Sequence, residues 1–304
     1  MGSPEFAVPT LQKLVEAGYE VALAVSQPDK PAGRGGRMQA PPVKVAAEGL
    51  GVEVFQPVTM RDEAVQARLR GTDADVFVVA AYGKILPQAV LDIPRRGCLN
   101  VHASLLPKWR GPSPIFASIL AGDAETGVSI MQLVRKMDAG PVLSTVRLPI
   151  RGEDTAEALE PRLAEAGADE LVRVLPAWLQ GSLTATPQDE AAATYCHLIA
   201  KDDGWLKASM TVAEAERAAR AYNPWPGAFV EYTGQRLGIW KARISSEEPG
   251  APGEARVIAR LPAVGFADGW LLLEEVQKPG GKRLSAQQFL AGERGAFGPV
   301  VRLG

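Results

Sequence analysis

The first half of the chain alternates short apolar runs, rich in β-branched residues, with segments of helical pattern. Runs this short and continuous are typical of strands buried on both faces of a sheet. We expect strands at 19–25, 52–55 and 76–81, and helices at 6–17, 43–50 and 62–69. Strands and helices in regular succession predict a doubly wound, mostly parallel α/β sheet.

One strand is absent from this succession. An α/β domain normally begins with a strand ahead of its first helix, but here the helical pattern at 6–17 begins almost at Met1. We therefore expect the first strand of the sheet to be missing from this sequence. We also expect a version extended by such a strand to be more stable, because losing an interior strand leaves neighbouring backbone groups unpaired.

The second half of the chain changes character. A long helical pattern at 155–179 is followed by a segment of mixed polarity without a period, and then by short strand patterns separated by glycines. The length of 304 residues also favours two domains. We expect a first domain over 1–180, a linker over 181–203, and over 204–304 a small β-barrel.

Composition excludes several classes of protein. Two cysteines and two histidines are too few for a disulfide framework and make a poor zinc set, so we expect no metal. The net charge of −2 argues against a protein that coats nucleic acid. No apolar run is long enough to cross a membrane. We expect a cytoplasmic monomer with no membrane partner.

The stretch from Cys98 to Ile115 places two polar residues in an apolar strand pattern. Asn100 and His102 alternate with Leu99 and Val101, so both point to the same face of a strand. Proline and glycine then end the strand and favour an extended loop. The pattern predicts an active site near a strand end, where α/β sheets bind ligands.

These residues supply the parts for acyl transfer. Asn100 offers an amide donor for a developing oxyanion, His102 offers a proton acceptor, and the glycine-flanked Asp138 offers a carboxylate to orient the imidazole. Ser104 lacks the G-x-S-x-G context of a serine hydrolase. The alternative is that His102 is a structural residue whose ring nitrogens find their hydrogen-bond partners within the core.

A basic loop precedes this region. Residues 27–44 are rich in proline and glycine and carry Lys30, Arg34 and Arg37. Their glycines lack the spacing of a dinucleotide fingerprint. Loops this long are usually functional, although a simply solvated loop is the alternative.

The joint spacing of Asn100, His102, SLLP at 104–107, Arg110 with Gly111, and the Asp138 loop resembles the formyltransferase family that uses 10-formyltetrahydrofolate. The resemblance covers nearly the whole chain. It implies a doubly wound catalytic domain and a C-terminal OB-like β-barrel. It also implies that 10-formyltetrahydrofolate is the formyl donor.

The resemblance also implies roles for individual residues. Asn100, His102 and Asp138 match the catalytic positions of the family. The folate-binding positions are Ser104, Leu105, Leu106 and Pro107, with Tyr82, Ile85 and Leu86 near the pterin.

The basic loop and the AYNPWPGAF motif at 221–229 imply methionyl initiator tRNA as the acceptor. Lys30, Arg34 and Arg37 then contact the tRNA, and basic residues of the barrel contact its phosphates. The barrel candidates are Lys241, Arg243, Lys278, Lys282 and Arg283. Two alternatives are a sibling formyltransferase that acts on a small amine and an RNA-binding protein without catalysis.

Overall fold

The computed structural model describes residues 1–32, 37–294 and 297–304. These residues form two compact units. The larger unit holds residues 1–114, 125–149 and 160–197, and the smaller holds 115–124, 150–159 and 198–304.

The larger unit contains two pieces of α/β sheet. One piece pairs β1 with β4 in parallel, and the other has the order β5-β6-β7-β8. Within it β5 and β6 are parallel, but β6, β7 and β8 are antiparallel. The α/β sheet is thus confirmed, with an antiparallel end. Its strands are β1 (Ala24–Val25), β4 (Val54–Phe55), β5 (Phe77–Val79), β6 (Cys98–His102), β7 (Glu125–Gln132) and β8 (Val142–Pro149).

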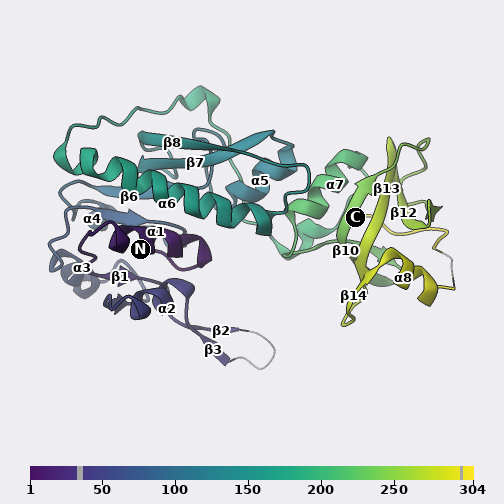
Figure 1. The fold of residues 1–304 in the computed structure, drawn as a ribbon, viewed down its shortest axis with the longest axis horizontal. Coiled ribbons are helices and arrows are strands. Elements are labelled where there is room, and N and C mark those ends of the chain that lie inside the picture. Colours follow the sequence, from purple (N-terminus) through teal and green to yellow (C-terminus); the bar gives the residue numbers. More distant parts are fainter. Residues whose placement is uncertain (33–36, 295–296) are drawn as a thin grey trace. The chain divides into compact units, whose positions relative to one another are not determined.

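Helices cover these sheets. In Figure 1 the long helix α6 runs along the β6–β8 strands with α1 beside it. Lys13 of α1 forms ion pairs with Glu165 and Asp169 of α6. A side chain at Gly167 would collide with Val101 of β6, so glycine lets α6 approach the sheet. The helices are η1 (Glu5–Ala7), α1 (Val8–Glu16), α2 (Pro42–Gly49), α3 (Glu63–Arg70), α4 (Gln88–Leu91), α6 (Ala156–Gln180), whose residues 156–159 belong to the smaller unit, and η2 (Glu190–Ala192).

A cavity of about 340 Å³ lies between the two pieces of sheet. Met1 and Gly2 reach between the ends of β1 and β5, where the Gly2 amide donates to the Val25 carbonyl and the Ala80 amide donates to the Met1 carbonyl, both at 2.9 Å. The cavity continues from there between residues 19–25 and 72–78. Its lining is largely apolar and includes Leu11, Leu14, Val43, Phe77, Leu175 and Leu179.

The smaller unit is built around an antiparallel sheet. Its strand order is β11-β12-β13-β10-β9, with β14 paired to β13. Val300 forms a single bridge to Glu254, next to β11, and Arg302 forms one to Glu231 of β9. The C-terminal segment therefore joins the two edges of this open sheet. The elements are α5 (Pro114–Ala121), whose first residue belongs to the larger unit, η3 (Lys201–Gly204), α7 (Val212–Ala221), β9 (Ala228–Tyr232), β10 (Gln235–Ile244), β11 (Ala255–Ile258), β12 (Leu261–Phe266), β13 (Gly269–Gln277), β14 (Arg283–Ser285) and α8 (Ala286–Gly292).

Three local expectations were wrong. The 27–44 segment is not a bare loop, because β2 (Lys30–Ala32) and β3 (Arg37–Gln39) pair antiparallel within it. The strand expected at 19–25 shrinks to β1. Helix α8 was missed although Ser285 and Gln288 form a capping box at its start, a signal that predicts a helix.

Candidate active site

Strand β6 presents Asn100 and His102 beside each other on the sheet. Strand alternation places Cys98, Asn100 and His102 on one face of the sheet, and Leu99 and Val101, both fully or nearly fully buried, on the other. Asn100 lies opposite Met131 of β7 and is half-buried. Among the described residues the Asn100 amide has no hydrogen-bond partner, so it is available to a ligand.

The His102 ring has a defined tautomer. Its Nε2 lies 3.0 Å from the backbone oxygen of Trp109. A carbonyl oxygen only accepts hydrogen bonds, so Nε2 carries the proton and Nδ1 holds the lone pair of the neutral ring. Nδ1 faces the carboxylate of Asp138, 3.9 Å from Oδ2. The ring is therefore arranged to accept a proton on Nδ1 next to a negative charge.

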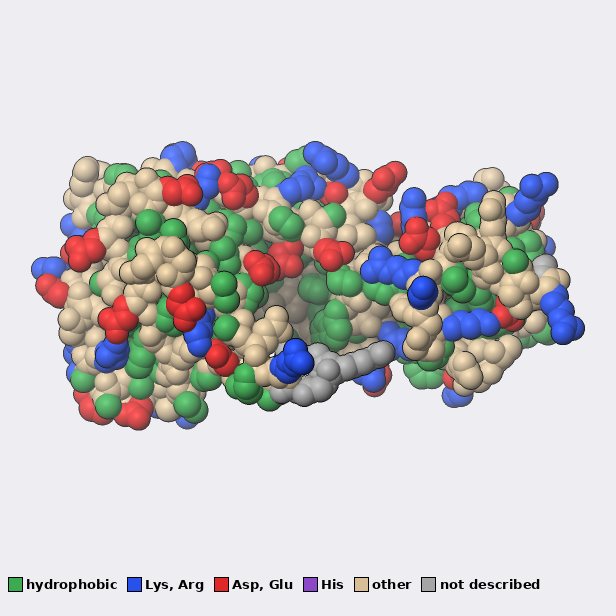
Figure 2. Space-filling view, turned by 60° about the horizontal axis from the view of Figure 1, so that its bottom comes forward, with side chains coloured by type: hydrophobic (Ala, Val, Ile, Leu, Met, Phe, Trp, Pro, Cys, Tyr) green, Lys and Arg blue, Asp and Glu red, His purple; other side chains and the backbone are tan. Residues whose placement is uncertain are grey.

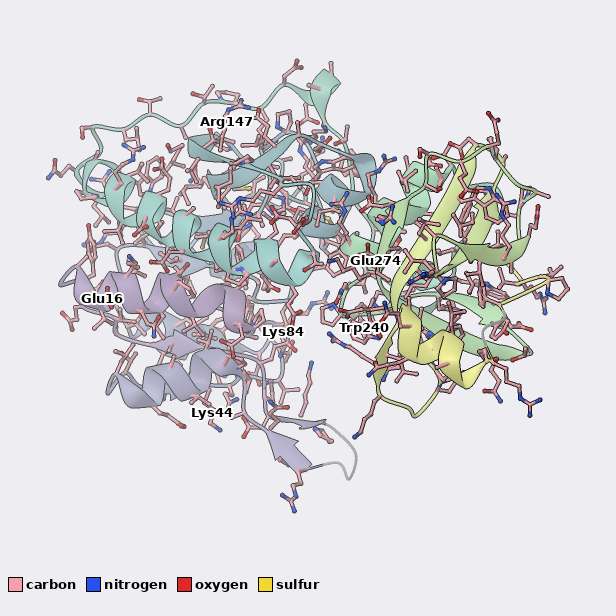
Figure 3. All side chains as sticks on the ribbon, turned by 45° about the vertical axis from the view of Figure 1, so that its right-hand side comes forward. Glu16, Lys44, Lys84, Arg147, Trp240 and Glu274 are labelled. Carbon is pink, nitrogen blue, oxygen red and sulfur yellow. The ribbon has the colours of Figure 1, made fainter. Side chains whose placement is uncertain are left out.

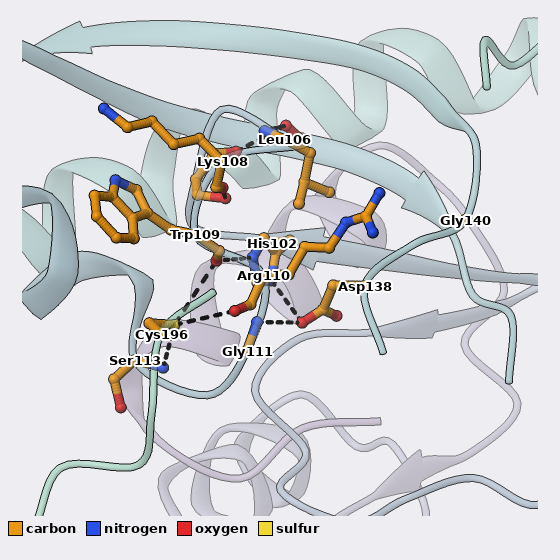
Figure 4. A network of polar contacts seen from close by, with 12 residues as sticks. His102, Leu106, Lys108, Trp109, Arg110, Gly111, Ser113, Asp138, Gly140 and Cys196 are labelled. Atoms are coloured by element: carbon orange, nitrogen blue, oxygen red, sulfur yellow. Dashed lines mark hydrogen bonds and ion pairs between the residues drawn. The ribbon is translucent and has the colours of Figure 1, made fainter. Parts of the chain in front are cut away.

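Asp138 reaches this position because its loop folds back. Strand β7 is antiparallel to β6, and its last residue Gln132 pairs with Leu99 near the start of β6. Asp138 then adopts a φ of 46°, a left-handed conformation that costs a non-glycine residue about 1 kcal/mol. Its Oδ2 accepts a hydrogen bond from the Gly111 amide at 2.8 Å. Figure 4 shows this contact beside the His102 ring.

Gly111 meets the loop from the other side. Its φ of 122° is unfavourable for a residue with a side chain, and a Cβ there would collide with the backbone oxygen of Cys196. The Cys196 sulfur accepts from the Ser113 amide at 3.3 Å and lies 3.4 Å from the Arg110 carbonyl. Burial raises the pKa of this thiol. Cys196 is thus a packing residue rather than a nucleophile.

The turn at 104–108 follows β6 directly. Ser104 is fully buried and donates to the Lys108 carbonyl at 2.6 Å. The Ser129 hydroxyl links the Ser104 carbonyl to the Leu106 amide at 2.7 and 3.1 Å. The Ser104 hydroxyl therefore shapes the turn, and Leu105, Leu106 and Pro107 are half-buried on it.

The residues expected near the pterin follow β5, at the same sheet edge as the turn after β6. They have different environments. Tyr82 is buried in the apolar cluster around β5, where burial raises the pKa of its phenol to about 12. Leu86 packs against the same cluster, and Ile85 is 87% exposed.

The basic segment is anchored at its base. Lys44, drawn on α2 in Figure 3, forms an ion pair with Asp29 at 2.9 Å. Hydrogen bonds from Gln56 and Lys44 lower the pKa of Asp29. Lys30 on β2 donates to Gln27 at 2.6 Å, and Arg37 on β3 is exposed. Arg34 lies outside the described residues.

No pattern in the sequence indicates the network around Arg110. This arginine is fully buried and donates to Gln188 and to both carboxylate oxygens of Glu190. Hydrogen bonds from Arg110 and then Lys136 lower the pKa of Glu190 to about 2. Residues 188–196 lie in the segment expected to be a linker, yet they pair with the 107–110 backbone. No periodicity marks this segment, and its partners are about 80 residues away.

The smaller unit carries basic side chains on its sheet. Arg283 stacks over the Trp240 ring, with its guanidinium carbon 3.3 Å from the ring centre. Lys241 and Arg243 of β10 flank Glu274 of β13 at 3.5 and 3.2 Å. Figure 3 labels Trp240 and Glu274, and Figure 2 shows Lys and Arg side chains on the visible face of this unit.

Two features are absent from the part of the chain that the structure describes. No group of three or more His, Cys, Asp or Glu side chains there is arranged to hold a metal ion. No helix of those residues is long and apolar enough to span a membrane.

Two family models match the chain. The model described as formyl transferase matches residues 1–175, and the model described as formyl transferase, C-terminal domain, matches residues 198–294. A methionyl-tRNA formyltransferase of Dechloromonas aromatica is 46% identical over 98% of this chain and 96% of its own. One from Stutzerimonas stutzeri is 44% identical over 100% and 96%.

Solved structures share the fold. An N-formyltransferase from Helicobacter canadensis, in complex with folinic acid and dTDP-3-aminofucose, aligns with a TM-score of 0.66 at 15% identity, over 91% of this chain and 97% of its own. HypX from Aquifex aeolicus, in complex with tetrahydrofolic acid, aligns with a TM-score of 0.59 at 19% identity, over 80% of this chain and 43% of its own.

Proposed function

The chain belongs to the formyl transferase family, and we propose from this premise that it formylates methionyl initiator tRNA for translation initiation. The formyl group comes from 10-formyltetrahydrofolate and goes to the free α-amino group of the esterified methionine. Relatives that match this chain over nearly its whole length are methionyl-tRNA formyltransferases. The alternative, a sibling enzyme acting on a small amine, is supported by more distant likenesses, such as the Helicobacter canadensis N-formyltransferase at 15% identity.

The folate donor fits what surrounds the catalytic residues. The Asn100 amide lacks a partner among the described residues, and the half-buried turn at 105–107 offers apolar surface beside it. We assign Ser104, Leu105, Leu106 and Pro107 to folate binding, with Ser104 acting through the turn that it shapes. Bound folate supplies a formyl carbon open to attack by an amine.

Three residues divide the chemistry. As the amine nitrogen bonds to the formyl carbon, Asn100 donates a hydrogen bond to the formyl oxygen, where negative charge develops. His102 takes the amine proton on Nδ1, and the resulting imidazolium lies between the Trp109 carbonyl and the Asp138 carboxylate. The same proton then passes to N10 of the folate as the bond between N10 and the formyl carbon breaks. Protons and charge balance over the cycle.

The remaining assignments concern the two substrates. Tyr82 and Leu86 shape the floor near the pterin from within the apolar cluster, and the exposed Ile85 contacts it. Lys30, Arg34 and Arg37 contact the tRNA. Five basic side chains of the smaller unit contact its phosphates: Lys241, Arg243, Lys278, Lys282 and Arg283.

The domains then have separate tasks. Residues 1–180 form the catalytic domain, 181–203 the linker, and 204–304 the OB-like tRNA-binding domain. The enzyme works in the cytoplasm as a monomer and needs no metal.

The observation that carries the proposal is the His102 ring, whose tautomer is fixed by Trp109 and whose free nitrogen faces Asp138. The test measures formyl transfer from 10-formyltetrahydrofolate to methionyl initiator tRNA by the parent chain and by His102→Ala. We expect rapid transfer by the parent and at least a 100-fold lower kcat for the variant. Full activity of His102→Ala would contradict the mechanism. Faster transfer to an amino sugar nucleotide or to glycinamide ribonucleotide would favour the sibling reading.

A further inference from the structure

We propose that Gln188 is a positioning residue that holds the Asp138 loop in its reactive conformation. The Gln188 side-chain amide bonds to two backbone carbonyls of that loop and to the buried Arg110. The proposal rests on the function proposed above, because it concerns the placement of the Asp138 carboxylate beside His102.

The first observation is where Gln188 bonds. Its Nε2 donates to the carbonyls of Asp138 at 2.8 Å and Gly140 at 2.7 Å. The first carbonyl is that of Asp138 itself, whose φ of 46° is left-handed, and the second follows two residues later. One side chain therefore fixes the backbone at Asp138, which faces His102, and at the glycine two residues later. Since the loop must fold back from the far end of β7, its position depends on such cross-links.

The second observation is that Gln188 can bind in only one orientation. Its Oε1 accepts from Nε and Nη2 of Arg110 at 3.1 and 2.9 Å. A guanidinium only donates and a carbonyl only accepts, so exchanging the two ends of the amide would break all four bonds. Arg110 is in turn fixed by Glu190, which accepts at 2.9 and 3.2 Å. Arg110 and Glu190 thus hold the Gln188 side chain in one orientation, and Gln188 in turn holds the loop.

The test is the substitution Gln188→Glu. It keeps the side-chain length and an oxygen for Arg110, but it removes the NH2 group that holds the two carbonyls. We expect kcat for methionyl-tRNA formylation to fall about 10- to 100-fold, as for residues that orient catalytic groups from behind. The KM values for folate and tRNA should stay within about twofold, because both ends of the Gln188 amide already bond to protein groups.

The matched control is Gln66→Glu. Gln66 is buried in the same unit and its Nε2 donates to the Met60 carbonyl at 3.1 Å, far along the chain from the catalytic residues. The control undergoes the same chemical change, since it also loses an amide NH2 group that donates to a backbone carbonyl. We expect it to melt at a lower temperature and to keep its kcat. An equal loss of kcat in both variants would overturn the assignment.

A double-mutant cycle separates positioning from a general structural effect. In an Asp138→Asn background the carboxylate that Gln188 places is already gone, so Gln188→Glu should lower the residual rate by less than about threefold. A full additive loss in that background would overturn the proposal. If the parent chain does not formylate methionyl initiator tRNA, the proposed function fails. If Asp138→Asn leaves kcat unchanged, the role of Asp138 fails and the positioning role of Gln188 fails with it. If Asp138→Asn lowers kcat while Gln188→Glu does not, only the positioning role fails.

Discussion

Replacing Asp138 by asparagine removes one negative charge from the site and keeps the shape of the side chain. The carboxylate lies 3.9 Å from the His102 nitrogen that accepts the proton. At an effective dielectric constant of about 20, opposite charges at that distance attract by about 4 kcal/mol. The interaction exists only while the ring is charged, so it lowers the barrier without helping the neutral resting state.

Part of this attraction is offset by solvent, so we expect kcat to fall by about 100- to 1,000-fold in Asp138→Asn. The asparagine oxygen can still accept from the Gly111 amide, so the melting temperature should change little. The assay is single-turnover formylation of methionyl initiator tRNA at saturating folate. Asp62→Asn is the control, because Asp62 is an exposed N-cap whose role asparagine fulfils equally well. A kcat within threefold of the parent would refute the electrostatic reasoning.

Three further predictions concern the scaffold, the acid range and the tRNA surface. Gly111→Ala should destabilise the chain by about 2 kcal/mol or more and lower kcat, because of its φ of 122° and the collision with Cys196. Gly49→Ala in α2, which meets nothing within 4 Å, should stabilise it by about 0.5 kcal/mol in the same melts. The pKa of Glu190 is lowered from 4.5 to about 2, so its contribution to stability is complete above pH 4.5 and lost as the pH falls toward 2. The difference in melting temperature between the parent and Glu190→Gln should therefore shrink over that range, and a constant difference would contradict the ion pair. Arg283→Gln should raise the KM for tRNA and reduce the slope of log KM against log salt by about 1, whereas Arg95→Gln should change neither.

Period-2 patterning was sufficient to place Asn100 and His102 on one strand, because strand alternation is a local property of the sequence. The glycine-flanked Asp138 was recognisable as a loop acid, but no residue pattern indicates that β7 runs antiparallel to β6, so the folding back of the loop was not predicted. Antiparallel and parallel strands can have the same buried, apolar pattern, so strand direction was not available from the residues alone.

The network of Arg110, Gln188 and Glu190 was unpredictable for a different reason. Its hydrogen bonds connect residues 78 and 80 positions apart, and neither segment has a periodic pattern. Ser104 is a related case. The family resemblance predicts that it binds a ligand, but its hydroxyl donates a hydrogen bond to the Lys108 carbonyl. Local propensity carries no information on such partnerships, which depend on tertiary structure.

The C-terminal segment of the smaller unit has a consequence for self-association. On one side, the backbone of this segment forms hydrogen bonds with Glu231 of β9. On the other side, it forms hydrogen bonds with Gly253, which lies next to β11, and with Ala255 of β11. Unpaired strand edges are templates onto which strands of other molecules add. Undocking of this one short segment would expose two such edges in a single local opening. Residues 299–302 therefore protect both edges from intermolecular strand addition. Their loss should increase aggregation at temperatures well below the one at which the unit unfolds.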